Sequence, residues 1–377
     1  MLVIAAMMIG LTIFGGTKTI PLRVELDSSA EVVEHVDGVI EVTIDSQTMS
    51  YNGDQWRYQE TRSGKRTLFG PETTQNKFLN KENLLLVLTN ASFIAVMAVG
   101  MTGVIILAGI DLSVGSIYGL SALVGAMVLE VLSQSDSAWM SSGIVAVPLA
   151  VLVCCGVGAA CGLANGAMTV GFNVHPFVIT LGMMAGLRGL MIVLTNAESI
   201  GGFPESFTRG FFKLEVLSGI HPVPTAIMVV VALAGMFVLS LTVFGRRVFA
   251  IGGNETAARY AGVPVGRVKI VVYTLMGALA GLSGCIYLGY YGAGEPNAGM
   301  GFELKVIAAT VIGGASLMGG RGTALGAVLG AIVIMLIDNG MVTLGIPQNW
   351  NQIVMGAAII VAVVVDQSKS RFGARGR

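Results

Sequence analysis

The stretch LVLTNASFIAVMAVGMTGVIILA, residues 86–108, decides the fold class. It contains no charged residue and is longer than the roughly 20 apolar residues that a helix needs to cross a bilayer. Nine further apolar segments occur along the chain, several of them shorter. They cover about 1–16, 114–133, 143–163, 176–195, 224–244, 269–291, 303–318, 322–338 and 349–366. The sequence therefore predicts an all-α polytopic membrane protein with about ten transmembrane helices.

The composition of the whole chain supports a membrane location. Of 377 residues, 54% are hydrophobic and only 12% are charged, whereas a soluble domain has roughly 25% charged residues. Glycine is about twice as frequent as usual, with 52 residues, and small residues let helices pack closely in a membrane. The glycines and serines around the shorter segments indicate short or broken helices among the spans. The net charge of zero argues against a nucleic-acid partner.

The N-terminal part of the chain differs from the rest. A secretory signal normally begins with basic residues, but the apolar segment 1–16 has none before it. We therefore interpret it as a first transmembrane segment. Residues 17–83 are polar, and 39–44 partly alternate between apolar and polar side chains. The stretch Tyr51-Asn52-Gly53-Asp54 predicts a hairpin turn. We expect a small β-rich extracytoplasmic insert at 17–83; a disordered loop is the alternative interpretation.

Basic residues predict the orientation in the membrane. With an even number of spans and the N-terminus inside, the cytoplasmic connections hold six Lys or Arg residues. The basic tail, 367–377, adds four more. The short external loops hold only Arg209 and Lys213. We therefore expect both termini in the cytoplasm.

The sequence carries no motif for catalysis or for metal binding. It has neither the glycine-rich phosphate loop of an ATPase nor a nucleophile elbow. The histidines and cysteines lack the spacing of ligand sets, and the cysteines lie in apolar stretches. These residues are His35, His175, His221, Cys154, Cys155, Cys161 and Cys285. We expect a chain that is not an enzyme and that holds no metal or cofactor.

The loop 245–268 predicts a short helix at about 255–261. Asn254 is a good N-cap, and Glu255 suits the positive end of the helix and lies four residues before Arg259. A glycine followed by Pro264 ends the helix. The residues that define it are Asn254, Glu255, Arg259 and Gly262. A short helix on the cytoplasmic face is either a rigid handle for another protein or a simple connection between two spans.

Four stretches of the chain resemble motifs of one protein family and occur in the same order as in that family. They favour the interpretation of the helix as a handle for another protein. They are the loop itself, AGIDLSVGS at 108–116, EPNAGMGFEL at 295–304 with VIGGASLMGGRGT at 311–323, and NGMVTLG at 339–345. Over about 84–366 the chain resembles the membrane permease subunits of bacterial ABC importers for ribose, xylose and galactose. The resemblance makes the loop 245–268 the coupling loop. The insert at 17–83 departs from the family pattern, and Lys305 stands where an acidic residue is common.

The resemblance implies a multi-pass protein of the bacterial inner membrane that moves a monosaccharide by alternating access. It implies three partners: an ATPase subunit that binds the ATP, an extracytoplasmic solute-binding protein, and a second permease copy or homologue. Within the same class, a nucleoside or a branched-chain amino acid is the alternative cargo. Outside it, the alternatives are an ion-coupled secondary transporter, which needs carboxylates inside the membrane, and a membrane scaffold.

Polar residues inside or beside the apolar segments are candidates for the translocation pathway. Asp111 and Ser113 either lie near the solute path or cap the next helix, and we favour capping by Asp111 of the N–H of Ser113 or Val114. Arg188 needs an acidic partner or carbonyl groups inside the bundle. Asn297 either contacts sugar hydroxyls at the outer mouth or shapes a turn.

The remaining features have structural interpretations. Glycines repeat every four residues in two stripes, which predict closely packed helices rather than a glycine-lined passage. These stripes are Gly158, Gly162 and Gly166, and Gly322, Gly326 and Gly330. Glu130 and Asp338 lie near segment ends, so we expect them to face water.

Overall fold

The computed structural model describes residues 1–26, 30–34, 39–44, 47–60, 66–135, 139–216, 220–358, Ile360 and Val364. His35 and the basic tail, 367–377, lie outside these residues. The chain divides into two compact units. The smaller unit is Ile9–Asn83, and the larger one combines Met1–Met8 with Leu84–Arg377.

The described part of the smaller unit is built from two antiparallel sheets of three strands each. This unit has its own apolar core, which is formed by the buried side chains of Leu26, Ile40, Val42 and Leu68. The prediction of a β-rich insert is therefore confirmed. The first sheet contains β1 (Thr17–Leu26), β6 (Arg66–Asn76) and β5 (Arg57–Glu60), in that order. The second contains β2 (Glu31–Glu34), β3 (Val39–Ile44) and β4 (Gln47–Asn52).

The turn after Asn52 joins the two sheets, so the predicted hairpin is wrong. The side-chain Oδ1 of Asn52 accepts a hydrogen bond from the backbone N–H of Asp54 at 2.9 Å, as turn chemistry requires. However, β4 pairs with β3, whereas β5 pairs with β6. The ring of Trp56 lies against Gly70 on β6, and this contact places the strand that follows on the other sheet. The turn residues predict that the chain reverses direction after Asn52. Which strand β5 pairs with depends on which side chains are buried.

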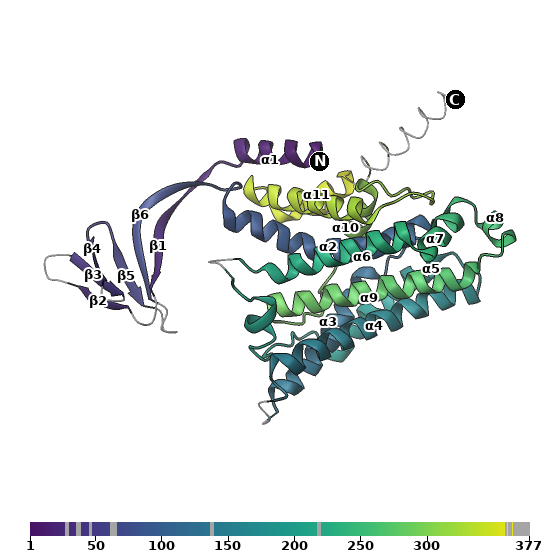
Figure 1. Cartoon of the computed structure of the whole chain (residues 1–377), viewed down its shortest axis with the longest axis horizontal. Helices are drawn as coiled ribbons and strands as arrows, with labels where there is room; N and C mark the ends of the chain where they lie inside the picture. The colour runs from purple at the N-terminus through teal and green to yellow at the C-terminus, as the bar shows by residue number, and fades with distance from the viewer. Residues whose placement is uncertain are drawn as a thin grey trace. The chain divides into compact units, whose positions relative to one another are not determined.

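Seven helices of the described residues are long and apolar enough to cross a membrane. They are α2 (Lys81–Ile106), α3 (Val114–Ser133), α4 (Gly143–Gly171), α5 (Pro176–Thr195), α6 (Pro222–Leu241), α9 (Val265–Tyr291) and α11 (Ala324–Thr343). The predicted all-α polytopic fold is thus confirmed (Figure 1). Among the described residues, seven helices rather than the expected ten or so are long enough to span, because an apolar run can also form a shorter helix.

Shorter helices complete the helical part of the chain. They are α1 (Leu2–Phe14), the π-helix η1 (Thr208–Phe212), α7 (Val243–Gly253), α8 (Glu255–Tyr260), α10 (Phe302–Ile312) and the 3₁₀-helix η2 (Gln348–Trp350). The apolar segment at 303–318 is thus an 11-residue helix followed by turns, which confirms the expected short or broken helices. The 13 residues of α1 are fewer than a straight span needs, so its role as a first transmembrane segment stays a prediction.

Two contacts between α2 and α9 show how these helices run relative to each other. On α2, Phe93 contacts Tyr291 near the end of α9, with ring centroids 6.0 Å apart, and Gly103 lies against Val272 near its start. α2 therefore runs antiparallel to α9. The chain enters α2 at one end of the helical unit, and α8 lies at the other end, next to the start of α9 (Figure 1).

Glycines hold α4 and α9 in close contact. A Cβ added to Gly158 would collide with the backbone of Gly277, and one added to Gly277 would collide with Gly158. Gly162 lies in the same way against the backbone of Tyr273. Membrane helices associate by such close packing because lipid supplies little hydrophobic drive for their association. The packing interpretation of this stripe is confirmed.

The second stripe is only partly helical. Gly326 and Gly330 lie on α11 against the backbone of Gly313 and Ala309, so they pack α11 on α10 as predicted. Gly322 precedes the helix, which begins at Ala324. Its neighbours are the side chains of Ile106 and Thr102 on α2, so Gly322 belongs to a different contact.

An ion pair between α10 and α11 corrects the expectation for Asp338. Its carboxylate lies 2.5 Å from the ammonium group of Lys305, and both side chains are only 19% exposed. Asp338 therefore does not simply face water. A carboxylate this far buried needs a cation, and Lys305 supplies it. Glu130, near the end of α3, is partly exposed.

Candidate functional site

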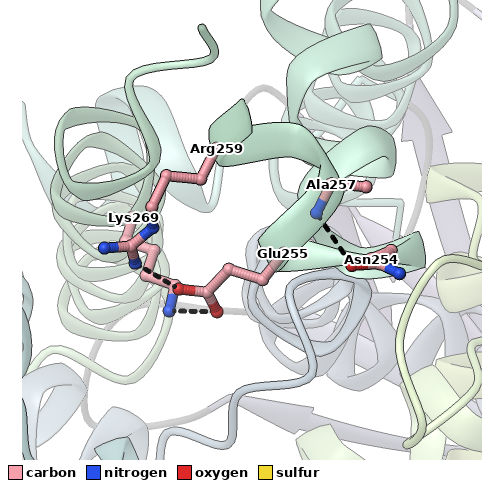
Figure 2. A network of polar contacts seen from close by, with 5 residues as sticks. All are labelled: Asn254, Glu255, Ala257, Arg259 and Lys269. Atoms are coloured by element: carbon pink, nitrogen blue, oxygen red, sulfur yellow. Dashed lines mark hydrogen bonds and ion pairs between the residues drawn. The ribbon is translucent and has the colours of Figure 1, made fainter. Parts of the chain in front are cut away.

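Asn254 forms the corner between α7 and α8. It ends α7, and its side-chain Oδ1 accepts a hydrogen bond from the backbone N–H of Ala257 at 2.9 Å (Figure 2). The predicted N-cap is confirmed. Gly262 follows α8 with φ of +79°, a left-handed conformation that glycine adopts without strain.

Glu255 joins α8 to α9 through two ion pairs (Figure 2). Its Oε1 lies 3.1 Å from Nη2 of Arg259, which confirms the predicted pair, and its Oε2 lies 2.8 Å from Nζ of Lys269. The hydrogen bond from Lys269 lowers the pKa of Glu255 below its ordinary value, while partial burial opposes the shift. Lys269 was not expected here because a separation of 14 residues is not a helical neighbour distance.

The loop 245–268 is more helical than expected. The sequence predicts one short helix, whereas α7 fills most of the preceding stretch as well. Thr242 caps α7, since its Oγ1 accepts a hydrogen bond from the backbone N–H of Gly245 at 3.1 Å. The signal for this helix was present: a threonine N-cap three residues before the bonded amide.

The exposure of its residues makes α8 suitable as a docking element. Ala258 is buried and anchors the helix, whereas Tyr260 is 87% exposed. Arg259 also reaches outward, although it is held by Glu255. A helix that is fixed at its base and presents an aromatic ring and a guanidinium group has the side chains that interfaces favour.

Two cavities lie next to α8. The larger one has a volume of about 580 Å³ and is lined by Thr169, His175, Glu255, Arg259 and Lys269, among others. The smaller one has a volume of about 180 Å³ and shares His175, Glu255 and Lys269 with the first. Its other walls include Gly109 and Tyr273. Glu255 and Lys269, whose ion pair joins α8 to α9, are thus walls of both cavities.

Asp111 lies in the connection between α2 and α3 and is fully buried. Its Oδ1 accepts hydrogen bonds from the backbone N–H of Ser113 at 2.8 Å and from the hydroxyl of Ser113 at 2.6 Å. The expected bond from the Ser113 N–H is present, but Asp111 does not cap α3: the N-cap is Ser113, which makes no side-chain capping bond. The amide of Asn165 on α4 donates to Ser113 Oγ at 2.8 Å, which extends the group by a residue that the sequence did not point out.

Several polar atoms around Asp111 lack a partner among the described residues. They are Asp111 Oδ2, Asn165 Oδ1, Thr169 Oγ1 and the hydroxyl of Tyr273. Each buried polar atom without a hydrogen bond lowers the stability of the fold by roughly 1–3 kcal/mol. Four such atoms close together are therefore rare unless they serve a function.

The other two candidates for the pathway lie around the segment between α9 and α10. Arg188 on α5 donates a hydrogen bond from Nη1 to the backbone carbonyl of Ala298 at 2.7 Å, which is the carbonyl partner expected for it. Asn297, the neighbouring residue, is exposed, and its carbonyl accepts from the N–H of Met300 in a turn. The four candidates thus form two groups: Arg188 contacts the segment that contains Asn297, and Asp111 contacts Ser113. Within the described residues, no three histidine, cysteine or acidic side chains gather as metal ligands.

Comparisons with known proteins agree with this architecture. The family model described as "Branched-chain amino acid transport system / permease component" matches residues 83–363. The ribose import permease protein of Escherichia coli K12 is 39% identical over 299 residues, which cover 79% of this chain and 89% of the relative. The D-allose transport system permease protein of the same strain is 37% identical, over 78% of this chain and 86% of the relative.

The galactose/methyl galactoside import permease protein of Haemophilus influenzae is 35% identical, over 78% of this chain and 88% of the relative. No solved structure matches the chain. The six strands of the described residues all precede the stretch that the family model matches. Because that match covers most of the chain, and relatives of this identity match over most of their own length, the chain belongs to this family of membrane transport permeases.

Proposed function

We propose that this chain is the permease subunit of an ATP-driven importer in the bacterial inner membrane and that its cargo is a monosaccharide. The names of the relatives, which specify ribose, galactose and allose, support this class of cargo. The observation that carries the mechanism is α8, a short helix fixed to α9 by the Glu255–Lys269 ion pair. We infer no catalytic role and no bound cofactor for the chain itself.

In this proposal a separate ATPase subunit binds ATP and docks on α8. Movement of the ATPase subunit displaces α8, and the ion pair carries the displacement into α9 and its glycine-packed partner α4. A second permease copy or homologue provides the other half of the pathway, since two-fold pairing is the commonest symmetry. An extracytoplasmic solute-binding protein delivers the sugar.

Orientation follows from the docking role. If α8 faces the cytoplasm, the start of α2, at the other end of the helical unit, faces outward. The strands come directly before α2 in the chain, so we place the smaller unit, Ile9–Asn83 (the β unit), on the extracytoplasmic side of the membrane. Here it can modify how the solute-binding protein docks.

The test is ATP-dependent sugar uptake into vesicles that contain the permease, its ATPase subunit and its solute-binding protein. Glu255→Ala with Arg259→Ala should abolish uptake while the permease still folds. A matched control exists in the pair Glu205–Arg209, which has the same four-residue spacing at 3.4 Å and is about 80% exposed. Glu205→Ala with Arg209→Ala should leave uptake unchanged.

The same vesicles decide between cargo classes. The description of the family model names branched-chain amino acids, so leucine uptake is measured beside uptake of ribose, galactose and allose. Uptake of leucine but of no sugar contradicts the proposed cargo. Uptake that follows an ion gradient without ATP contradicts the proposed mechanism and favours an ion-coupled transporter.

A further inference from the structure

We propose that a buried group of polar side chains binds the hydroxyl groups of the cargo at the inner end of the cavities beside α8. The group consists of Asp111, Ser113, Asn165, Thr169 and Tyr273. This inference rests on the proposed import function and locates the place where the sugar is held on its way to the cytoplasm. It is named the Asp111 site below.

One side of the Asp111 site is fixed by hydrogen bonds within the protein. Ser113 donates two bonds to Asp111 Oδ1, and Asn165 donates to the hydroxyl of Ser113. These bonds join the connection after α2 to α4. They hold the carboxylate and the amide in fixed orientations, which a binding site needs.

The other side of the site consists of oxygen atoms that no described residue satisfies. Asp111 Oδ2, Asn165 Oδ1 and the hydroxyl groups of Thr169 and Tyr273 all belong to residues that are at least nine-tenths buried. Buried polar groups in proteins nearly always have a hydrogen-bond partner. Four unsatisfied oxygen atoms in one region therefore point to a polar ligand.

Neighbour contacts bring these residues to one region of the bundle. Asn165 and Thr169 are four residues apart and so lie on the same face of α4. Between them, Gly166 brings α4 close to Tyr273: a Cβ at that position would lie 3.2 Å from the Tyr273 Cβ. The Tyr273 hydroxyl in turn lies only 2.6 Å from the Cβ position of Gly109, two residues before Asp111.

The cavities beside α8 reach two residues of the Asp111 site. Thr169 lines the larger cavity, and Tyr273 lines the smaller one. Both cavities also have Glu255 and Lys269 in their walls. A displacement of α8 would therefore reshape the cavities that Thr169 and Tyr273 line, which would link docking to release of the cargo.

The chemistry of the site fits a polyhydroxy ligand. A carboxylate oxygen and an amide oxygen accept hydrogen bonds, while the threonine and tyrosine hydroxyls both donate and accept. A sugar presents hydroxyl groups that each donate one bond and accept others, so it can satisfy all four atoms together. The site holds a single carboxylate, so a cation would find only one charged ligand there.

The test uses Thr169→Val and Tyr273→Phe, which each remove one unsatisfied hydroxyl and little else. The purified permease–ATPase complex in lipid nanodiscs is dialysed against radiolabelled ribose, galactose or allose, without ATP and without the solute-binding protein. Each variant should bind the imported sugar about tenfold more weakly, the loss expected for one hydrogen bond. Tyr290→Phe, which removes a hydroxyl near the far end of α9, should bind the sugar like the wild type.

Thermal stability separates a binding role from a structural one. Because both variants remove a buried group without a partner, their melting temperatures should stay equal to that of the wild type or rise. Variants that bind sugar normally overturn the inference, as does sugar binding by the wild type that requires sodium. Loss of binding that merely follows a lower melting temperature in both variants also overturns it.

The two proposals fail in different ways. If the complete wild-type system imports no sugar, the proposed function is contradicted. If it imports sugar but Thr169→Val and Tyr273→Phe bind and import it normally, only the Asp111 site is contradicted.

Discussion

At the scale of single residues, the ion pair between Lys305 and Asp338 shows how a partly buried charge is stabilised by a charge of opposite sign. Lys305→Ala leaves the carboxylate of Asp338 partly buried and unpaired. We expect a loss of roughly 1–3 kcal/mol, between the values typical of surface and of buried pairs. Heat-induced unfolding in detergent measures the effect. Arg209→Ala, which breaks the exposed pair with Glu205, should change the melting temperature very little.

A double variant checks the cause of that loss. Lys305→Met with Asp338→Leu removes both charges and leaves none buried alone, so it should be more stable than Lys305→Ala. Equal instability of the single and double variants would mean that packing, rather than charge, explains the effect.

The ion pairs of Glu255 predict a pH dependence. Because the pKa of Glu255 is lowered in the folded protein, its contribution to stability is present above the ordinary pKa of about 4.5. That contribution disappears as the pH falls further, through the lowered pKa. The difference in melting temperature between the wild type and Glu255→Gln should therefore stay constant from about pH 8 to pH 6 and vanish in acid. A difference that changes near neutral pH contradicts this assignment.

Sequence patterns predict interactions between residues close in the chain and miss those between distant ones. Asn254, Glu255 and Arg259 were placed correctly because an N-cap and an i,i+4 pair depend only on spacing. Lys269 was missed, and so was the pairing of Asp338, because their partners come from another helix. The same reason explains why Asn165, Thr169 and Tyr273 did not stand out as members of a site with Asp111.

At the scale of elements, the contact between α4 and α9 depends on glycine. Gly158→Ala puts a methyl group into the backbone of α9, and we expect a loss of roughly 1–3 kcal/mol, as for other overpacked sites. The matched control is Gly156→Ala on the same helix, since an added Cβ there meets no described atom within 4 Å. Melting temperatures of the two variants check the prediction. A loss of equal size in both would show that helix propensity or lipid contact, not packing, is responsible.

Helix patterns were easier to predict than strand pairings. Long runs without charge located the seven spanning helices, because a helix that crosses lipid needs about 20 apolar residues. The same signal also marked 1–16 and 303–318, whose helices have only 13 and 11 residues. The repeat of Gly158, Gly162 and Gly166 predicted a contact face, although the identity of α9 as its partner required the structure. In the β unit, the turn at Asn52 was visible in the sequence, but the sheet that the next strand joins was not, since pairing depends on burial across the unit.

At the scale of the whole molecule, the β unit is separable from the transport unit. The family match begins at residue 83, and the strands form their own apolar core. Replacing 17–76 by a short flexible linker should therefore leave the helical unit folded, with a melting temperature close to that of the wild type. If the unit modifies docking, uptake at saturating solute-binding protein should be retained while the concentration needed for half-maximal uptake changes. Loss of folding would show that the helices depend on the strands.

The side of the membrane on which the β unit lies can be tested at Asn52, the exposed last residue of β4. We expect Asn52→Cys to react with a membrane-impermeant maleimide added from outside. A cysteine at Tyr260 should react only from the cytoplasmic side. Reaction of both cysteines from the same side contradicts the proposed orientation.

The corner at Asn254 also restricts the length of the loop between α6 and α9. One residue both ends α7 and begins α8, so no spare residue separates the two helices. Each residue inserted into a helix rotates everything after it by about 100°. A single insertion at the end of α7 would turn Glu255 away from Lys269 and point Tyr260 in a new direction. Evolution can thus exchange side chains in this loop far more freely than it can add or remove a residue.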